Sequence, residues 1–227
     1  MIIVIPARGG SKRLPHKNIY PLKGKPLLTY TLEAIAATGL NIPTYVSTDD
    51  EDIASVARAY QGVEVIMRPP EIADDTASTE SVLLHVLDIL AERKQTPQWL
   101  MTLPPTSPFR TASTILGFAE AVEGCADDID CLMSVTENRG DFWRMEPHGR
   151  MDRLFPAAPR RQQDRTPLYE ENSAVYVSRT SALRDTGVIL GRVVLGIPIS
   201  SLEGFDINNP EDMRLAECLH DIEHGDR

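Results

Sequence analysis

Hydrophobic and polar positions follow two patterns that alternate along most of the chain. Short apolar runs such as Ile2–Ile5 are typical of strands buried on both faces of a sheet. Between these runs, apolar residues recur every three or four positions, as at Ile53, Val56 and Tyr60, which is the spacing of one face of a helix. The repeated order of strand and helix predicts an α/β fold with a mostly parallel sheet and helices on both faces.

The same patterns give approximate bounds for the elements. We expect strands at Ile2–Ile5, Thr44–Thr48, Val63–Ile66, Trp99–Leu103, Cys131–Val135, Ala174–Val177 and Val193–Ile197. Helices are expected near residues 28–36, 53–60, 79–93 and 115–122. A last helix begins after Asn209 as N-cap, with Pro210 at its first position.

The segment from Asn138 to Glu171 interrupts this order. It contains four prolines, a run of arginines and few periodic apolar residues. We therefore expect one domain over residues 1–227, with residues 138–171 inserted as an arm. Because the arm has too little apolar periodicity to pack on its own domain, we expect it to pack on a second copy of the chain in a homodimer.

Charge and cysteine content narrow the class of protein. The 227 residues include 23 lysines and arginines and 33 acidic residues, a net charge of −10, which disfavours a nucleic-acid backbone as partner. Three cysteines without C-x-x-C spacing indicate reduced thiols and a cytoplasmic location. No apolar run approaches the ~18 residues of a membrane span, and the run before Pro6 is too short for a signal peptide, so we expect no membrane anchor.

The strongest chemical signal is the segment Pro6–Asn18, directly after the first strand. Four cations lie within ten residues, beside two glycines that let backbone N–H groups approach a ligand: Arg8, Lys12, Arg13 and Lys17. In a parallel sheet such a loop faces the ligand crevice, and fixed cations there suit a triphosphate. The segment matches neither a P-loop nor a dinucleotide-binding glycine motif, and its alternative is a solvated basic turn.

Two further segments that follow strands offer polar groups. In Leu103–Arg110, three prolines make a stiff platform that carries the hydroxyls of Thr106 and Ser107 and the cation of Arg110. In Arg68–Thr79, small and hydroxyl residues at the entrance of a helix are suited to reading a base or a ribose. The alternative for each is a plain loop that ends in a helix cap.

The segment Phe205–Asp212 offers metal ligands. Asp206 and Asn208 are two residues apart, so on an extended backbone both point to the same side, where their oxygens suit Mg²⁺ or Mn²⁺. The alternative is that the segment only caps the last helix. Within the predicted arm, Arg160–Arg165 is suited to holding a phosphate or a carboxylate, against the alternative of a solvated charge run.

Taken in order, these segments resemble the acylneuraminate cytidylyltransferases, the family of CMP-sialic acid synthetases and relatives acting on other nonulosonic acids. The resemblance spans nearly the whole chain in seven stretches: Ile5–Asn18 (IPARGGSKRLPHKN), Ser47–Asp49, Arg68–Thr79 (RPPEIADDTAST), Leu103–Arg110 (LPPTSPFR), Arg160–Asp164, Tyr169–Tyr176 (YEENSAVY) and Phe205–Asp212 (FDINNPED). It implies a Rossmann-like nucleotidyltransferase fold with an arm exchanged across a homodimer. It also implies transfer of a cytidylyl group from CTP to an acidic nine-carbon sugar, with release of pyrophosphate.

The resemblance assigns roles to individual residues. It implies that the nucleotide is bound by Arg8, Lys12, Lys17, Asn18, Arg68, Ala77 and Thr79. It implies further that the sugar lies near Pro104, Thr106, Ser107, Arg160 and Arg161, and that the metal is held by Asp206 and Asn208. We expect Arg8, Lys17 and Asp206 to act in catalysis, in which the anomeric hydroxyl attacks the α-phosphorus directly and no protein nucleophile takes part.

Three positions depart from the family pattern. Pro104 replaces a sugar-contacting glutamine, Asn208 replaces the second aspartate of the metal site, and Ser173 replaces the glycine of an Asn-Gly pair. The first leaves the choice of nonulosonic acid open, and the second is expected to weaken metal binding. Two alternatives stay open: a nucleotidyltransferase for another sugar or sugar phosphate, and a nucleotide-binding regulatory module that has lost the chemistry.

Overall fold

The computed structural model describes residues 1–73 and 77–225 of the chain. Within these residues, one large sheet has the strand order β11-β7-β10-β6-β1-β4-β5. Its strands are β1 (Ile2–Pro6), β4 (Thr44–Thr48), β5 (Val63–Met67), β6 (Trp99–Thr102), β7 (Cys131–Asn138), β10 (Leu168–Arg179) and β11 (Val194–Pro198). Only β10 runs against its neighbours, so the sheet is mixed but mostly parallel, as predicted.

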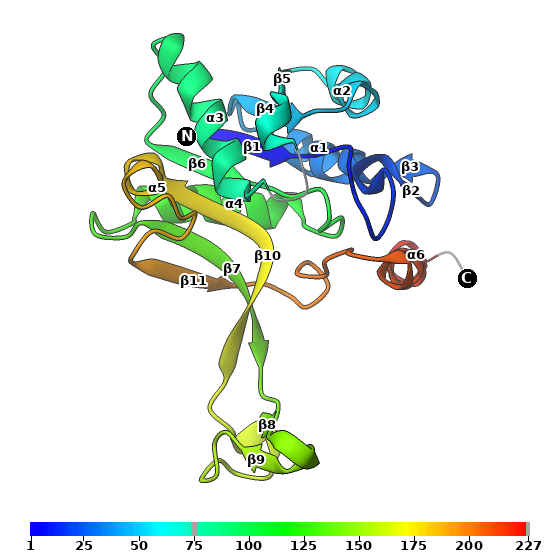
Figure 1. The fold of residues 1–227 in the computed structure, drawn as a ribbon, viewed down its shortest axis with the longest axis vertical. Coiled ribbons are helices and arrows are strands. Elements are labelled where there is room, and N and C mark those ends of the chain that lie inside the picture. Colours follow the sequence, from blue (N-terminus) through cyan, green and yellow to red (C-terminus); the bar gives the residue numbers. More distant parts are fainter. Residues whose placement is uncertain (74–76, 226–227) are drawn as a thin grey trace.

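Helices cover both faces of this sheet (Figure 1). They are α1 (Leu27–Ala37), α2 (Glu51–Arg58), α3 (Thr79–Glu92), α4 (Ala112–Glu123), α5 (Thr180–Thr186) and α6 (Pro210–His224). Successive residues of a strand point to opposite faces. Ile3 and Ile5 of β1 therefore pack with α1, α2 and α4, whereas Ile2 and Val4 pack with α3 and α5. This double burial explains the continuous apolar run at the start of the sequence.

Side-chain caps fix where several helices begin. Asp50 accepts hydrogen bonds from two backbone N–H groups at the start of α2, and Ser78 and Thr111 do the same for α3 and α4 with one each. Asn209 caps α6 in a reciprocal capping box with Asp212, and Pro210 occupies the first position. These caps place the starts of α2, α3 and α6 beside the carboxyl ends of the parallel strands.

Short elements fill the connections. The hairpin of β2 (Pro21–Leu22) and β3 (Lys25–Pro26) follows the 3-10 helix η1 (Lys17–Ile19), and a second 3-10 turn, η2 (Pro70–Ile72), follows β5. These short elements and α5 were not predicted from the sequence. No described helix is long and apolar enough to cross a membrane. Cys125, Cys131 and Cys218 are free thiols.

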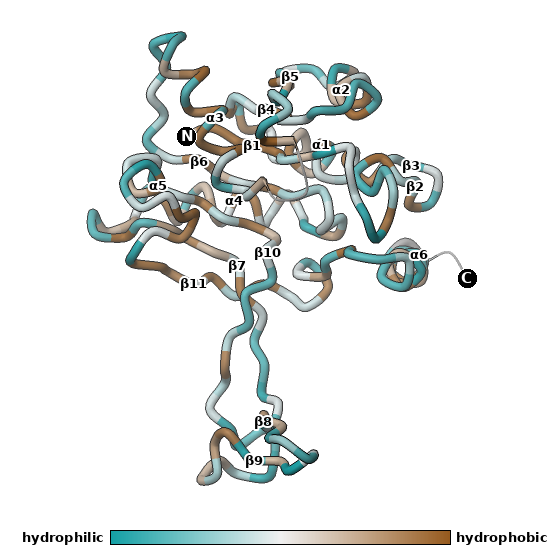
Figure 2. The backbone as a smooth tube through the Cα atoms, in the orientation of Figure 1, coloured by the Kyte–Doolittle hydropathy of each residue, from teal (hydrophilic) through white to brown (hydrophobic). Residues whose placement is uncertain are grey.

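The predicted arm projects from the body of the molecule (Figure 1). Its stem is a continuation of the β7–β10 ladder, and its tip holds the hairpin of β8 (Trp143–Met145) and β9 (Met151–Arg153) with two 3-10 turns, η3 (Pro147–Gly149) and η4 (Gln162–Asp164). The strands are thus longer than predicted, because β7 ends at Asn138 and β10 begins at Leu168. Figure 2 shows hydrophobic residues concentrated in the main sheet, with hydrophilic and hydrophobic residues mixed along the arm.

Candidate functional site

The carboxyl ends of β1 and β6, together with Arg68 after β5, line a cavity of about 510 Å³. The loops after these strands, the start of α3 and residues of β10 complete its lining. A second cavity of about 320 Å³ adjoins it and shares Arg8, Lys17 and Asn18 with it. The crevice therefore lies where the sheet topology predicts a ligand site.

The smaller cavity is basic. Its lining residues are Arg8, Ser11, Lys12, Arg13, Lys17, Asn18 and Asn208. All four cations predicted for the loop after β1 are therefore brought together, with an amide and a hydroxyl beside them. Cations gathered around one small cavity suit the phosphates of a nucleotide.

The basic loop is held in place by hydrogen bonds that the sequence did not reveal. The Gly9 N–H donates to Asp49 Oδ1 at 2.9 Å, and Asn18 Nδ2 donates to the Arg8 carbonyl at 2.9 Å. A side chain at Gly9 would meet Asp50, since an added Cβ would lie 2.4 Å from Asp50 Oδ2. Glycine is required here for close packing against the start of α2.

Lys17 is partly buried. Its ammonium donates to the Ile207 carbonyl at 2.9 Å. Burial lowers the pKa of Lys17, and the nearby charge of Asp206 opposes this shift. The lysine thus joins the basic loop to the segment that carries the predicted metal ligands.

Arg68 lies at the end of β5 and lines the larger cavity with Ala77 and Thr79. Its guanidinium donates to Ser47 Oγ at 3.1 Å and to the Ser47 carbonyl at 2.8 Å. Burial lowers the pKa of Arg68 to about 10, with Asp49 opposing the shift. The stretch at the entrance of α3 therefore faces the cavity, as predicted, except for residues 74–76, which lie outside the described residues.

The proline platform after β6 contributes Pro104, Pro105 and Thr106 to the cavity wall. The predicted contribution of Ser107 does not hold in this structure: it is 1% exposed and is not among the residues that line the cavity. Arg110 is also turned inward, away from the cavity, and is 3% exposed. The platform thus presents prolines and one hydroxyl to a ligand, while its cation is internal.

Asp206 and Asn208 lie close together, as their spacing predicted. Asn208 Nδ2 donates to Asp206 Oδ2, and the intervening Ile207 N–H donates to the Thr106 carbonyl at 2.9 Å. Asp206 lines a third cavity of about 480 Å³ with Glu137, Glu170 and Glu171, whereas Asn208 lines the basic cavity. Among the described residues, no three of the types His, Cys, Asp and Glu form a metal-binding cluster. The pair offers one carboxylate and one amide, a set that a phosphate-bound Mg²⁺ accepts.

A model of the family described as "Cytidylyltransferase" matches residues 2–181. The chain belongs to this family. The match covers the basic loop, Arg68, the proline platform and β10, and it confirms the predicted resemblance. The C-terminal segment with Asp206 and Asn208 lies beyond the matched residues.

Curated relatives support the same assignment. The N-acylneuraminate cytidylyltransferase of Escherichia coli is 30% identical over 219 residues, which is 95% of this chain and 51% of that protein. The chain thus spans about half the length of this relative. The pseudaminic acid cytidylyltransferase of Campylobacter jejuni is 27% identical over 236 residues, covering 98% of this chain and 97% of that protein.

A solved structure confirms the predicted fold. The structure of CMP:2-keto-3-deoxy-manno-octonic acid synthetase complexed with CTP superposes with a TM-score of 0.70, at 17% identity and 98% coverage of both chains. The nucleotidyltransferase fold predicted from the sequence is therefore the observed one.

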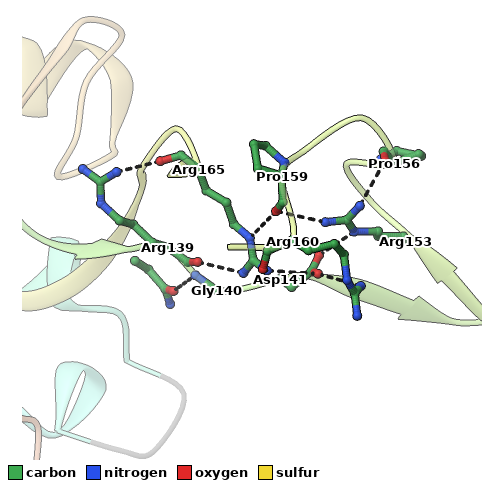
Figure 3. Close-up of polar contacts among 9 residues, drawn as sticks. Arg139, Gly140, Asp141, Arg153, Pro156, Pro159, Arg160 and Arg165 are labelled. Carbon is green, nitrogen blue, oxygen red and sulfur yellow. Dashed lines mark hydrogen bonds and ion pairs between the residues drawn. The ribbon is translucent and has the colours of Figure 1, made fainter. Parts of the chain in front are cut away.

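The family resemblance had placed Arg160 and Arg161 near the sugar. Within one chain they do not line the cavities described above. Arg160 lies at the arm tip (Figure 3), and Arg161 follows it as the N-cap of η4. There, the Asp141 carboxylate accepts from Arg153 Nε at 2.8 Å and lies 3.3 Å from both Arg160 Nη1 and Arg165 Nη2. Arg160 is 76% exposed at its side chain.

Three residues of β10 line the larger cavity without having been predicted to do so: Glu171, Ser173 and Tyr176. The Tyr176 hydroxyl donates to Glu171 and contacts Ser173 Oγ at 3.0 Å, and burial raises its pKa. Ser173 has a φ of 60°, in the left-handed region that favours glycine. The family pattern has a glycine at this position, and that glycine was the available sequence signal that the backbone turns here.

Proposed function

We propose that this chain transfers a cytidylyl group from CTP to a nonulosonic acid and releases pyrophosphate. The observation that carries the proposal is the basic cavity of Arg8, Lys12, Arg13 and Lys17, which opens into the larger cavity at the carboxyl edge of the sheet. Membership of the cytidylyltransferase family supports CTP as the nucleotide. Relatives that act on N-acylneuraminate and pseudaminic acid support the class of acceptor. The free thiols of Cys125, Cys131 and Cys218 favour a cytoplasmic location for the reaction.

The cavities suggest how the substrates lie. The phosphates occupy the basic cavity, and the cytidine lies between Arg68 and the start of α3, where Ala77 and Thr79 line the wall. The acceptor then occupies the side nearest β10, beside Pro104, Thr106 and Tyr176. This order puts the acceptor hydroxyl next to the α-phosphorus. A new P–O bond forms to that hydroxyl oxygen, and the bond to pyrophosphate breaks.

Fixed cations assist this displacement. As pyrophosphate departs, negative charge grows on the β- and γ-phosphates, and Arg8, Lys12 and Lys17 are placed to balance it. Mg²⁺ or Mn²⁺ would be held by Asp206 and the Asn208 amide oxygen, together with the phosphates of the nucleotide. When bound, the ion supplies further charge neutralisation at the phosphates. No covalent bond to a protein nucleophile is formed, and the proton of the attacking hydroxyl passes to solvent.

The acceptor side of the larger cavity needs a cation from elsewhere. In the described part of the chain its basic residues are Arg8, Lys17 and Arg68, all on the nucleotide side, while Glu171 lies on the β10 side. An acidic sugar bound beside Glu171 requires a positive partner. We propose that Arg160 and Arg161 of a second chain supply it, which makes the active form a homodimer.

Pyrophosphate release tests the proposal. CTP is incubated with a panel of 2-keto sugar acids, with and without Mg²⁺, and pyrophosphate is measured. We expect release only when CTP, a nonulosonic acid and the divalent ion are all present. Release with a sugar phosphate and not with any nonulosonic acid would establish a different nucleotidyltransferase. CTP binding without release from any member of the panel would favour a regulatory module.

A further inference from the structure

Arg110 is a buried cation without a carboxylate partner in the part of the chain that the structure describes. It lies between β6 and α4 and is 3% exposed. Nη1 donates to the Ala174 carbonyl at 2.7 Å, and Nη2 donates to Thr31 Oγ1 at 2.8 Å. The Pro104 carbonyl lies 3.3 and 3.4 Å from the two terminal nitrogens. The guanidinium thus binds two backbone carbonyls and a hydroxyl on three separate elements.

Holding the positive charge of Arg110 at this buried position is energetically unfavourable. Burial lowers the pKa of Arg110 to about 9, and Nε has no partner among the described residues. Glu203 is the one acid that opposes the pKa shift, and its carboxylate is occupied at the start of α4, where it accepts from Thr111 and Thr114. Replacing a buried ionic group by apolar side chains is often neutral or stabilising. Stability alone therefore does not explain an arginine here.

The two carbonyls belong to adjacent segments at the wall of the larger cavity, the chain just after β6 and the paired strand β10. Pro104 begins the platform that lines the cavity after β6. Ala174 follows Ser173 in β10, where the pairing register with β7 shifts between Glu171 and Tyr176. A bulge of this kind leaves backbone groups unpaired in the ladder. Arg110 donates a hydrogen bond to one of these groups, the Ala174 carbonyl, and also binds the Pro104 carbonyl of the platform.

The platform is in turn joined to the predicted metal segment and the basic loop. The Thr106 carbonyl accepts from the Ile207 N–H at 2.9 Å, and the Ile207 carbonyl accepts from Lys17 Nζ at 2.9 Å. A shift of the platform would therefore move Ile207, between Asp206 and Asn208, and disturb the lysine.

We propose that Arg110 is a positioning residue that fixes the spacing between the proline platform and the β10 bulge from beneath the cavity. The proposal rests on the proposed function, because the acceptor is placed beside these two segments. The planar fork of arginine holds both carbonyls at once, which neither lysine nor an apolar side chain can do. Misplacing a bound reactant by about 1 Å can reduce the rate by about a hundredfold.

The test compares Arg110→Met and Arg110→Lys with the control Arg179→Met. Arg179 also donates to backbone carbonyls, those of Ile129 and Ala126, and stacks on Trp99, but it does not line the cavities described above. Hydrogen exchange is measured along each chain. We expect faster exchange in both wall segments, residues 103–110 and 171–176, in Arg110→Met and not in Arg179→Met. Unchanged exchange in either wall segment of Arg110→Met would overturn the proposal, whether or not the wild-type protein turns over any sugar.

Kinetics supply the second measurement. At a temperature where all variants are folded, Arg110→Met should lower kcat/KM for the acceptor by at least about tenfold. The Kd for CTP should change by less than about threefold, and Arg110→Lys should recover part of the loss. If wild-type protein is active but Arg110→Met and Arg179→Met have equal kinetic constants, Arg110 has only a structural role. Lack of wild-type activity, by contrast, contradicts the proposed function and leaves the exchange measurement to decide the role of Arg110.

Discussion

Lys17 illustrates how a single cation serves both structure and chemistry. Its ammonium is partly buried, donates to the Ile207 carbonyl and lines both the basic cavity and the larger one. A lysine held in this way has few conformations to lose when phosphates bind, so its charge is preorganised. The same burial lowers its pKa, which ties its charge state to pH in a measurable way.

Replacing Lys17 by Ala should therefore lower kcat by about a hundredfold, because a charge partner of the departing phosphates is lost. The control is Lys25→Ala, since Lys25 is exposed and pairs with Glu33 at 2.9 Å. In wild-type protein, activity should fall on the alkaline side below pH 10.5, the ordinary pKa of lysine, because the lowered pKa removes the proton sooner. Lys17→Ala with normal kcat would exclude the lysine from catalysis.

Pro104 bears on the choice of sugar. Proline has neither a side-chain hydrogen-bonding group nor an N–H, so it cannot make the contact for which the family resemblance implied a glutamine. We expect a preference for a nonulosonic acid with less polar surface than N-acetylneuraminate. Pro104→Gln should raise kcat/KM for N-acetylneuraminate relative to the native substrate, as measured over several nonulosonic acids. A strong preference of the unmodified protein for N-acetylneuraminate would contradict this inference.

At the scale of elements, the basic loop depends on close packing against the start of α2. Gly9→Ala should weaken CTP binding by about tenfold, because the added Cβ would lie 2.4 Å from Asp50 Oδ2 and push the loop away. Gly10 offers a matched control, since an added Cβ there meets nothing within 4 Å. Titration of both variants with CTP measures the difference. Equal affinities would show that the loop adapts without loss.

The conformation of the arm tip depends on one carboxylate, that of Asp141. Asp141 holds Arg153 Nε at 2.8 Å, and its pKa is lowered by that hydrogen bond and by the charges of neighbouring arginines. A lowered carboxyl pKa means that this contribution is present at neutral pH and is lost as pH falls through the lowered value. Asp141→Asn should weaken dimer formation by about tenfold, whereas Asp152→Asn, which affects an exposed pair with Arg150, should not. Sedimentation of both variants at neutral pH measures whether Asp141→Asn weakens the dimer while Asp152→Asn leaves it unchanged.

Sequence periodicity was sufficient to predict most of the helices and strands. It missed others for physical reasons. The buried strands and the caps at Thr111 and Asn209 were predictable because each leaves a local pattern. The first half of β10 was missed because residues 168–171 are exposed, so they show no apolar alternation. Arg110 looked like a ligand-facing cation because its burial depends on contacts with Thr31 and Ala174, which are far away in the sequence.

At the scale of the whole molecule, charge is distributed unevenly. Residues 139–167, the outer part of the arm, contain seven arginines and four acidic residues and carry +3, whereas the rest of the chain carries −13. The arm also exposes large apolar side chains, among them Trp143, Met145 and Phe155. A basic arm with exposed apolar residues fits the acidic body of a second copy. This arrangement agrees with the finding that, among the described residues, the cations lining the larger cavity lie on its nucleotide side.

Assembly can be tested by mixing. Arg160→Ala combined with Arg161→Ala should leave the fold and CTP binding intact and raise KM for the acceptor by at least about tenfold, because the sugar carboxylate loses its partner. The proposed exchange predicts that this doubly substituted chain, mixed with a Lys17→Ala chain, recovers activity in the mixed dimer. A monomer by sedimentation at micromolar concentration, with full activity, would contradict the exchange.

The central claim is transfer of a cytidylyl group to a nonulosonic acid. Its most direct measurement is the identification of products by mass spectrometry after incubation of CTP with several nonulosonic acids and Mg²⁺. The account predicts one CMP-sugar and one pyrophosphate for each CTP consumed, with UTP giving far less product. CTP consumed without a CMP-sugar, or a CMP-sugar formed only with sugars that lack the 2-keto acid group, would contradict it.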